Sequence, residues 1–449
     1  MNTIVAPATP TGRSAVGIIR LSGPESLSIL RKLIDDEAFA PEPNRVSLKQ
    51  IVKESGETLD SALVSYFRKP HSFTGEEMVE ISCHGSPVIL RQVLDLSLRL
   101  GARLAEAGEF TLRACKNGKM NLSQAEAIRD LINARSEAAA VQASRQLNGE
   151  LSAALQPAKD MLIQIIVRLE SALEFVEDDL PEIQTSQVRT TLVGAQEVVK
   201  GLVATYASGR TLREGLKLTI VGRPNVGKSS LFNRLVGLSR AIVTEIAGTT
   251  RDSISESISL RGVPIFLTDT AGIRVATDKI EELGVERTRQ LMADADLLVI
   301  VIDATTDLSE EDRAILNEAE TGKHVVAINK CDLLNGRKAK TGFSRSTVVQ
   351  VSALTGEGLD ELSAAILEPF GSVDSEAVGL LITDSRHYDL LQRAEASLKK
   401  ALDLFDEFAS EELVLVYLHN ALNFLGEITG ETTTDDILAE IFSTFCIGK

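Results

Sequence analysis

The chain has 449 residues, of which 44% are hydrophobic and 4% aromatic, and a formal net charge of −17 at pH 7. This length predicts two or three domains rather than one core, and the negative charge excludes a generally basic protein that coats RNA. The low aromatic content leaves few side chains on which single-stranded nucleic acid could stack.

Nothing in the sequence indicates export or a membrane anchor. The start of the chain lacks a basic head followed by a long apolar run, so we expect no secretory signal. The longest aliphatic run, residues 297–302, is too short to span a bilayer. Four cysteines without paired spacing fit a reducing compartment and do not fit a structural zinc site. We therefore expect a cytoplasmic protein with no membrane partner.

Residues 1–118 mix strand and helix signals and predict an α+β domain. Apolar residues suited to strands occupy 15–21 and 63–67, and an amphipathic helix is expected over 87–100. Turns that contain glycine or proline separate these elements. We expect this segment to form the first domain.

From residue 121 the apolar period becomes helical. Ser123 and Glu126 have the spacing of a capping box at the start of the first helix. Apolar stripes then run over 161–173 and 188–202. The same period returns near the end of the chain, over 390–405, 413–428 and 437–445.

Helical segments on both sides of an α/β segment predict an inserted domain. We expect a discontinuous helical domain made of residues 119–213 and 376–449, with residues 214–375 inserted between them. Each part would need the other to bury its apolar stripe. Two separate helical bundles are the alternative, because a sequence does not show which stripes meet.

The inserted segment begins with a phosphate-binding loop. Residues 222–229 read Gly-Arg-Pro-Asn-Val-Gly-Lys-Ser and directly follow the apolar strand expected over 216–221. A loop between a strand and a helix points several backbone N–H groups at one phosphate. Lys228 supplies a charge for the β- and γ-phosphates, and the hydroxyls of Ser229 and Thr250 are placed to bind Mg²⁺.

Three further motifs, each expected after an apolar strand, predict which nucleotide binds. Asp269 opens Asp-Thr-Ala-Gly and can reach the Mg²⁺ shell. Asp332 ends Asn-Lys-Cys-Asp, where a carboxylate can accept hydrogen bonds from the N1–H and amine of guanine but finds no such donors on adenine. Ser-Ala-Leu from residue 352 suits a loop that closes over the guanine carbonyl.

The motifs occur in this order within about 130 residues and predict GTP hydrolysis. Their order resembles that of the translation-factor-related GTPases, which implies a Ras-like, doubly wound sheet for residues 214–375. The predicted GTP contacts are Asn225, Val226, Gly227, Lys228, Ser229, Ser230, Thr244, Glu245, Ile246, Ala247, Gly248, Thr249, Thr250, Asp269, Thr270, Ala271, Gly272, Asn329, Lys330, Asp332, Ser352 and Ala353.

The motifs leave open how water is activated. Ile273 stands where Ras-type enzymes carry a glutamine, and an aliphatic side chain cannot hold a water for attack. Glu281 could orient the water through an intermediary, or it could be one of several solvated carboxylates. Arg274 is a further candidate, as an arginine finger within the chain.

A monovalent cation could supply the positive charge that the reaction needs. Asn225 could coordinate such a cation against the phosphates, completed by oxygen atoms of Thr244, Ile246 and Thr249. The alternative is that Asn225 only stabilises the loop.

Motifs outside the inserted segment resemble those of one family. They include Cys83-His84-Gly85, Gly108-Glu109-Phe110-Thr111, Asn121-Leu122-Ser123-Gln124-Ala125-Glu126 and the final Cys446-Ile447-Gly448-Lys449. Together with the GTP-binding motifs, they closely resemble the MnmE (TrmE) family of tRNA-modification GTPases, over essentially the whole chain.

The resemblance implies an activity and partners. Members of the family act as homodimers with a flavin-binding partner, MnmG, which uses FAD and NADH. Together they install an aminomethyl or carboxymethylaminomethyl group at carbon five of the wobble uridine in certain tRNAs. Their N-terminal domain resembles folate-binding domains and holds formyl- or methylene-tetrahydrofolate. The matching folate contacts here are Arg20, Glu80, Lys119 and Lys449, whose charges suit the glutamate tail and the pterin-like ring.

The resemblance also implies roles for residues of the reaction. Potassium would be bound by Asn225, Thr244, Ile246 and Thr249, Glu281 would be the catalytic glutamate, and Cys446 would match a cysteine important for the modification. The alternative function is that of a ribosome-assembly GTPase switch. Such proteins share the phosphate loop but append a basic RNA-binding module, whereas the C-terminal region here is helical and acidic.

Overall fold

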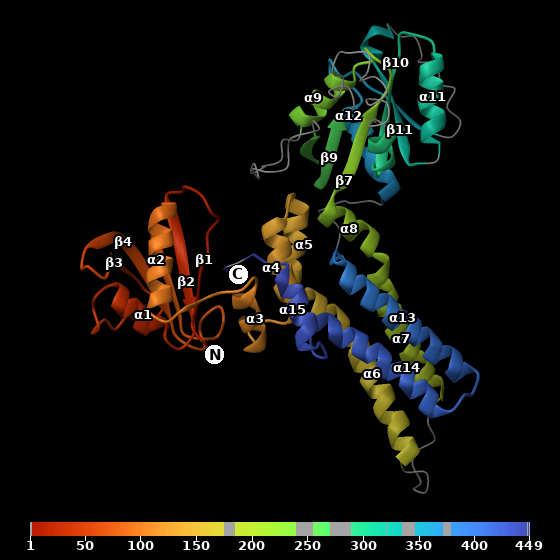
Figure 1. Ribbon diagram of the computed structural model, residues 1–449. Helices are drawn as coiled ribbons and strands as arrows, with labels where there is room; N and C mark the ends of the chain where they lie inside the picture. Colours follow the sequence, from red (N-terminus) through yellow and green to blue (C-terminus); the bar gives the residue numbers. More distant parts are fainter. Residues whose placement is uncertain are drawn as a thin grey trace. The chain divides into compact units, whose positions relative to one another are not determined.

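The computed structural model describes residues 2–174, 185–238, 255–269, 289–320, 322–334, 346–370, 379–446 and 448. The chain forms two compact units. Unit 1 contains residues 1–129 and 426–449, and unit 2 contains residues 130–425. Unit 1 therefore includes both ends of the chain, and unit 2 carries the phosphate-loop segment (Figure 1).

A six-stranded sheet forms most of unit 1. Its order is β3-β4-β5-β2-β1-β6, and neighbours pair antiparallel except for β1 and β6, which are parallel. Helices α1 (Ser26–Leu33) and α2 (Pro87–Arg99) share an apolar core with the sheet. The strands are β1 (Ile4–Pro7), β2 (Val16–Ser22), β3 (Val46–Val52), β4 (Thr58–Phe67), β5 (Met78–His84) and β6 (Arg103–Leu104). The predicted α+β character is confirmed, as are the two predicted strands and the predicted helix.

The last residues of the chain pack against the end of the N-terminal segment, within unit 1. The helices involved are α3 (Glu109–Lys116), α4 (Leu122–Asn133), which continues into unit 2, and α15 (Asp435–Ser443). They share a small core made of Leu122, Ala125, Phe442 and Phe445. Gly108, at φ +66°, permits this approach, because a Cβ there would lie 2.8 Å from the carbonyl oxygen of Phe442.

The capping box predicted at Ser123 and Glu126 is wrong by two residues. The side-chain oxygen of Asn121 accepts a hydrogen bond from Gln124 N at 2.9 Å, and that of Gln124 accepts one from Asn121 N at 3.0 Å. Asparagine caps a helix about as well as serine, so α4 already begins at Leu122. Ser123 and Glu126 lie inside the helix and are buried.

The helical part of unit 2 combines segments from both sides of the insertion. Its helices are α5 (Glu137–Leu147), α6 (Glu150–Glu174), α7 (Thr185–Ala204), α8 (Tyr206–Glu214), α13 (Ser385–Asp406) and the greater part of α14 (Glu411–Thr429). Helix α7 packs against α6 and also against α13. The predicted discontinuous helical domain is thus confirmed, while the residue boundaries given for the four segments stay a prediction.

A second six-stranded sheet carries the nucleotide motifs. Its order is β12-β11-β10-β7-β9-β8, and only β8 is antiparallel to its neighbour. The strands are β7 (Leu216–Val221), β8 (Ser255–Leu260), β9 (Val263–Asp269), β10 (Leu297–Asp303), β11 (His324–Asn329) and β12 (Thr347–Gln350). The principal helices are α9 (Lys228–Leu238), α11 (Glu310–Ala319) and α12 (Leu359–Leu367).

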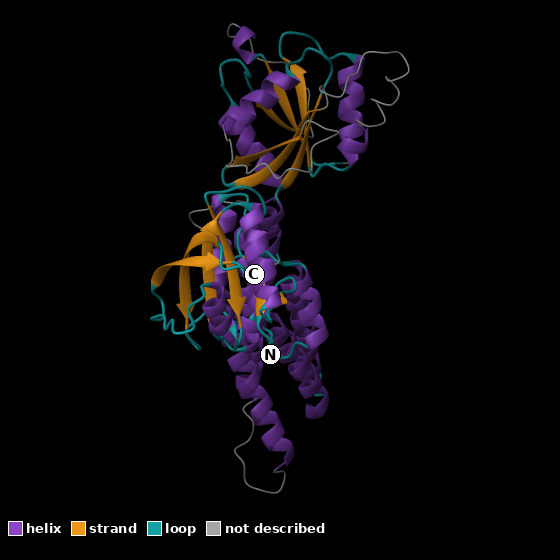
Figure 2. Cartoon of the chain, turned by 60° about the vertical axis from the view of Figure 1, so that its left-hand side comes forward, coloured by secondary structure: helices purple, strands orange, loops and turns teal. Residues whose placement is uncertain are grey.

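Helices cover both faces of this sheet (Figure 2). Alternate residues of β10 enter different apolar cores: Val299 and Val301 belong to one, and Leu298 and Ile300 to the other. A strand that is buried on both faces has a continuous run of apolar residues. This is why the aliphatic run over residues 297–302 indicated a strand at this place. The doubly wound sheet is confirmed.

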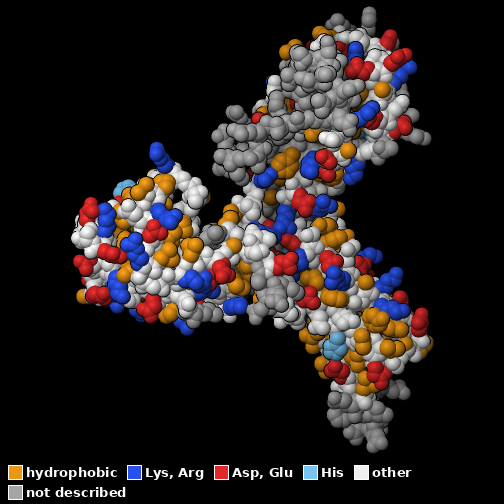
Figure 3. Space-filling view, in the orientation of Figure 1, with side chains coloured by type: hydrophobic (Ala, Val, Ile, Leu, Met, Phe, Trp, Pro, Cys, Tyr) orange, Lys and Arg blue, Asp and Glu red, His pale blue; other side chains and the backbone are white. Residues whose placement is uncertain are grey.

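Charged side chains show no large single-sign region on the face seen in Figure 3. Acidic and basic side chains are intermixed over both units in this view. Within the part of the chain that the structure describes, no helix has both the length and the apolar character needed to cross a bilayer.

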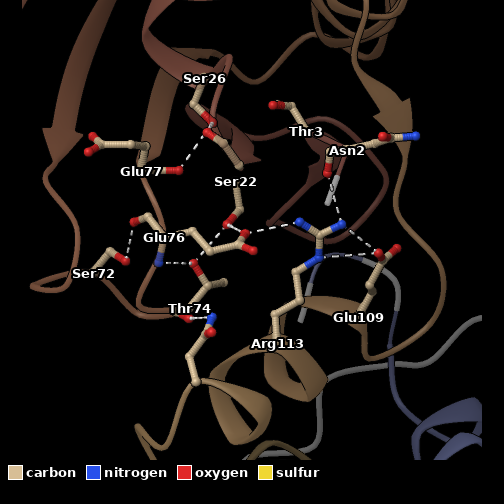
Figure 4. A network of polar contacts seen from close by, with 12 residues as sticks. Asn2, Thr3, Ser22, Ser26, Ser72, Thr74, Glu76, Glu77, Glu109 and Arg113 are labelled. Carbon is tan, nitrogen blue, oxygen red and sulfur yellow. Dashed lines mark hydrogen bonds and ion pairs between the residues drawn. The ribbon is translucent and has the colours of Figure 1, made fainter.

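A buried ion-pair network joins α3 to the sheet of unit 1 (Figure 4). The Arg113 guanidinium, only 6% exposed, donates to Glu76 Oε2 at 3.0 Å and to Glu109 Oε1 at 2.9 Å. It also donates to the backbone oxygen of Asn2 at 3.0 Å. Ser22 Oγ donates to Glu76 Oε2 at 2.8 Å. Arg113 therefore compensates the carboxylate of Glu76, and it shares Glu109 with Arg103, whose Nη2 donates to Glu109 Oε1 at 2.6 Å.

We expect Arg113→Ala to destabilise unit 1 by about 3–5 kcal/mol, because it leaves the buried carboxylate of Glu76 without its cation and leaves Glu109 paired with Arg103 alone. The matched control is Arg91→Ala, which breaks an exposed pair with Asp95 on one helix and should cost less than about 1 kcal/mol. Urea unfolding followed by circular dichroism measures both values. Equal, small losses in the two variants would show that the network contributes little to folding.

Candidate nucleotide and folate sites

The phosphate loop lies between β7 and α9, as predicted. Gly222 and Gly227 have φ values of +150° and +97°, and Asn225 between them also has a positive φ of +65°. A Cβ on Gly222 would lie 2.5 Å from the carbonyl oxygen of Val301, and a Cβ on Gly227 would overlap Nδ2 of Asn329. The two glycines thus allow β10 and the end of β11 to pack directly against the loop.

The loop's cation and hydroxyl groups are in position. Lys228, 8% exposed, donates from Nζ to the backbone oxygens of Gly222 at 2.7 Å and Arg223 at 2.9 Å. Ser229 Oγ donates to Asp269 Oδ2 at 2.8 Å, which places one predicted Mg²⁺ ligand beside the carboxylate predicted to reach the Mg²⁺ shell. A hydroxyl and a carboxylate are hard oxygen donors of the type that Mg²⁺ prefers, so these residues fit that ion.

Asn329 connects three of the predicted motifs. Its side chain, at the end of β11 and 2% exposed, donates from Nδ2 to the Val226 oxygen at 2.8 Å. Its Oδ1 accepts a hydrogen bond from Ala353 N at 3.0 Å. The phosphate loop, the Asn-Lys-Cys-Asp motif and the Ser-Ala-Leu motif are therefore held to one another by a single buried amide.

Lys330 adds a second link, through a residue that we did not predict. Its Nζ donates to the Asn225 oxygen at 2.9 Å and to Asp303 Oδ2 at 2.6 Å. Asp303 Oδ1 also accepts from the N–H and hydroxyl of Thr305, at 2.9 and 2.6 Å. Burial by itself would raise the pKa of Asp303, but these hydrogen bonds hold that pKa below its ordinary value. Asp303 is therefore a carboxylate that positions Lys330.

Arg223 is a second residue that sequence reasoning missed. Its guanidinium donates to the hydroxyl of Thr306, and its Nε lies 3.3 Å from Asp312 Oδ2. Asp312 is 1% exposed in the first turn of α11 and belongs to that helix's capping box with Ser309. The loop is thereby anchored to α11 as well as to the sheet.

The base-binding residues lie at the same edge of the sheet. Asp332 is in the short helix η2 (Cys331–Leu334), directly after β11, and is partly exposed. Ser352 is fully buried after β12, and its Oγ accepts from Thr355 N at 3.1 Å. The described motif residues thus converge where parallel strands end, which is the usual ligand position in open α/β sheets.

Several predicted site residues lie outside the described part of the chain, and their assignments stay predictions. They are Thr244, Glu245, Ile246, Ala247, Gly248, Thr249, Thr250, Thr270, Ala271, Gly272, Glu281 and Lys449.

Two predicted folate residues are paired in unit 1. Arg20 on β2 lies opposite Glu80 on β5, and its Nε and Nη2 donate to Glu80 Oε1 at 2.9 and 2.7 Å. The guanidinium carbon lies 5.6 Å from the ring centre of Phe73 and 5.8 Å from that of Phe110. Two charges of opposite sign beside aromatic rings could contact a planar heterocycle that carries an acidic tail.

The end of the chain meets this pair. Arg20 Nη1 lies 3.4 Å from the Gly448 oxygen, to which it donates. Gly448, at φ +94°, packs so closely that an added Cβ would overlap the Pro7 oxygen. Cys446 is exposed, and its carbonyl oxygen accepts from Gly108 N at 3.3 Å. Lys119 lies on the turn after α3 and donates to the Pro70 oxygen at 3.1 Å.

Comparison with known proteins decides the family. A family model described as the MnmE helical domain matches residues 122–446, and one described as the GTP-binding protein TrmE N-terminus matches residues 3–119. The chain belongs to the MnmE family. The resemblance of the sequence motifs to this family is therefore confirmed.

Full-length relatives agree with this assignment. A protein of Aquifex aeolicus is 46% identical over 448 residues, covering 99% of each chain. One of Koribacter versatilis is 44% identical over 453 residues, covering 100% of this chain and 99% of its own. One of Thermotoga maritima is 41% identical over 456 residues, covering 100% of both. All three are named tRNA modification GTPase MnmE. This chain is accordingly a GTPase, with GTP as its substrate.

Proposed function

We propose that this GTPase acts in the modification of tRNA as a potassium-activated homodimer, together with the flavoprotein MnmG. The products would be wobble uridines with an aminomethyl or carboxymethylaminomethyl group at carbon five. Full-length similarity to enzymes named for tRNA modification supports the process. The observation that supports a guanine nucleotide at this site is the buried amide of Asn329, which joins the phosphate loop to both base-binding motifs.

We propose separate roles in nucleotide binding for the predicted residues. Lys228 would move its ammonium from the loop carbonyls to the β- and γ-phosphate oxygens, and Asp332 would accept the guanine N1–H and amine hydrogens. Ser229, with Thr250 as the second ligand, would hold Mg²⁺, and Asp269 would orient that ion's shell. When bound, Mg²⁺ neutralises charge that develops on the phosphate oxygens.

The positive charge needed at the β–γ bridge is assigned to potassium. The exposed side chain of Asn225 belongs to a residue whose backbone is fixed by positive φ and by the hydrogen bond from Lys330. Thr244, Ile246 and Thr249 would complete the potassium site. Glu281 would orient the attacking water, which Ile273 cannot do.

We expect GTP turnover to be faster in KCl than in NaCl by about tenfold or more, since the cation takes the place of an arginine finger. Glu281→Ala should lower kcat by about 10²- to 10⁴-fold while GDP affinity stays unchanged. Single-turnover hydrolysis and GDP titration measure these quantities. Equal rates in both salts would remove potassium from the account, and normal turnover of Glu281→Ala would remove the glutamate.

Unit 1 would bind the one-carbon donor. We propose that Arg20, Glu80, Lys119 and Lys449 bind formyl- or methylene-tetrahydrofolate, with Cys446 taking part in the modification. The Arg20–Glu80 pair on the sheet supports this assignment, because it lies beside two aromatic rings and the end of the chain. FAD and NADH would act through MnmG, and the reaction would take place in the cytoplasm.

Mass spectrometry of tRNA nucleosides tests the proposed function. A strain that lacks the protein should lose the modified wobble uridines, and expression of the wild-type chain should restore them. Glu281→Ala should bind GTP but fail to restore them. Unchanged nucleosides in the deletion strain, with a defect in ribosomal subunits instead, would support the alternative of a ribosome-assembly switch.

A further inference from the structure

Two turns of unit 1 concentrate basic side chains in an acidic chain. Residues 61–75 include Arg68, Lys69 and His71 but no aspartate or glutamate, and residues 110–125 include three basic residues and again no acidic one. The whole chain carries a net charge of −17, so a local group of basic side chains differs in sign from the chain as a whole.

These two stretches lie against each other. Lys119 Nζ donates to the Pro70 oxygen at 3.1 Å, and Asn117 Nδ2 donates to the Thr74 oxygen at 2.7 Å. Gly75, at φ +76°, allows this approach, since an added Cβ would be 3.1 Å from Asn117 Cβ. The two turns thus form one basic surface, defined here as Arg68, Lys69, His71 and Lys119, and all four residues are exposed.

Nearby acidic side chains are already paired in the interior of the unit. Glu76 and Glu109 have only 14% and 11% of their side chains exposed, and both accept hydrogen bonds from Arg113 (Figure 4). Glu77 accepts a hydrogen bond from the hydroxyl of Tyr66. The carboxylates closest in sequence are thereby directed inward, and the charge presented to solvent by the two turns is positive.

We propose that this basic surface binds phosphate groups of the tRNA substrate. A polyanion binds where basic side chains are concentrated, and its affinity comes largely from release of counterions at those contacts. A chain of net charge −17, whose charges are intermixed on the face seen in Figure 3, must provide such a concentration locally. The inference rests on tRNA being the substrate, as proposed above, and it adds where on unit 1 the RNA lies.

The location also agrees with the proposed chemistry. Lys119 belongs both to the basic surface and to the proposed folate site, so RNA bound here would lie beside the one-carbon donor. The glutamate tail of folate is the competing anion for the same lysines, and the experiment must separate the two.

The test removes two charges from the basic surface without changing Lys119. Arg68→Gln with Lys69→Gln forms the test variant, and Lys399→Gln with Lys400→Gln, exposed on α13, forms a control with the same change in net charge. The tRNA dissociation constant of each full-length protein is measured by fluorescence anisotropy over a series of KCl concentrations. GTP turnover is expected to stay at the wild-type value in both variants.

For the test variant we expect weaker tRNA binding and a slope of log affinity against log salt that is smaller by about two, or about one for each lost phosphate contact. The control should keep the wild-type slope. An unchanged slope in the test variant, or an equal change in the control, would overturn the assignment. If the test variant lost folate affinity while its slope of log tRNA affinity against log salt stayed unchanged, the basic surface would bind the glutamate tail of folate and not tRNA. Absence of salt-dependent tRNA binding by the wild type would instead refute the proposed function.

Discussion

Replacing Gly227 by alanine is expected to weaken GDP and GTP binding by about 100-fold or more, which corresponds to about 2.7 kcal/mol. The residue has a φ of +97°, and an added Cβ would overlap Asn329 Nδ2. Asn329 would have to move and would lose its hydrogen bonds to Val226 and Ala353. One methyl group would thus disturb the phosphate loop and both base-binding motifs. Equilibrium titration with a fluorescent GDP measures the loss.

Gly237→Ala is the matched control for that variant. Gly237 lies near the end of α9, the helix that follows the same loop. A Cβ at this position would meet no atom within 4 Å. Because alanine favours a helix over glycine by about 1 kcal/mol, this variant should be slightly more stable and should bind GDP normally. If Gly227→Ala bound GDP as tightly as Gly237→Ala does, Asn329 would not be the link that we describe.

The Asp332→Asn variant is expected to lose GTP affinity by about 10³-fold or more and to gain affinity for xanthosine triphosphate. The carboxylate offers two acceptors to the N1–H and amine of guanine, whereas an amide offers one acceptor and a donor. Xanthine carries a carbonyl in place of the amine, which suits the amide. A site built around hydrogen bonds discriminates by leaving buried groups unpaired when the base is wrong. Competition titrations with the two triphosphates measure the change.

Asp360→Asn controls for the loss of one negative charge in unit 2. Asp360 is exposed in the first turn of α12, so its replacement should leave nucleotide preference unchanged. An Asp332→Asn protein that still preferred GTP over xanthosine triphosphate would show that a group other than the Asp332 carboxylate recognises the base.

The part of the fold that the sequence predicted well is the part in which one residue pattern determines one local structure. Strand β10 reads as an uninterrupted aliphatic run because both of its faces are buried. The phosphate loop is recognisable because its turn requires glycine at two positions where φ is positive. The order of the motifs along the chain then predicted the doubly wound sheet.

Contacts that depend on strand register were not predictable in this way. Asp303 directly follows the aliphatic run 297–302, which by itself gives it no functional signal, yet pairing of β10 with β11 places it opposite Asn329 and within reach of Lys330. A carboxylate at the end of a strand that neighbours the motif strands is the signal that could have identified it. Arg223 was missed for the same reason, since its partner Asp312 comes from a helix 89 positions later in the chain.

The proposed folate residues show a third reason why sequence patterns alone do not predict a site. Arg20 and Glu80 are ordinary charges in sequence, separated by 60 positions, and only the register of β2 with β5 makes them a pair. The approach of Gly448 to Pro7 depends on packing between opposite ends of the chain, for which no local pattern exists. The family resemblance identified these residues as candidates, whereas periodicity and spacing did not.

The central claim is that a guanine nucleotide with its magnesium binds at the carboxyl ends of the parallel strands of unit 2. Isothermal titration calorimetry of the full chain with GDP and with ADP, in magnesium- and potassium-containing buffer, tests it most directly. The account predicts saturable binding of one GDP per chain and an ADP affinity lower by about 10³-fold or more. No heat on addition of GDP, or equal affinities for the two nucleotides, would contradict it.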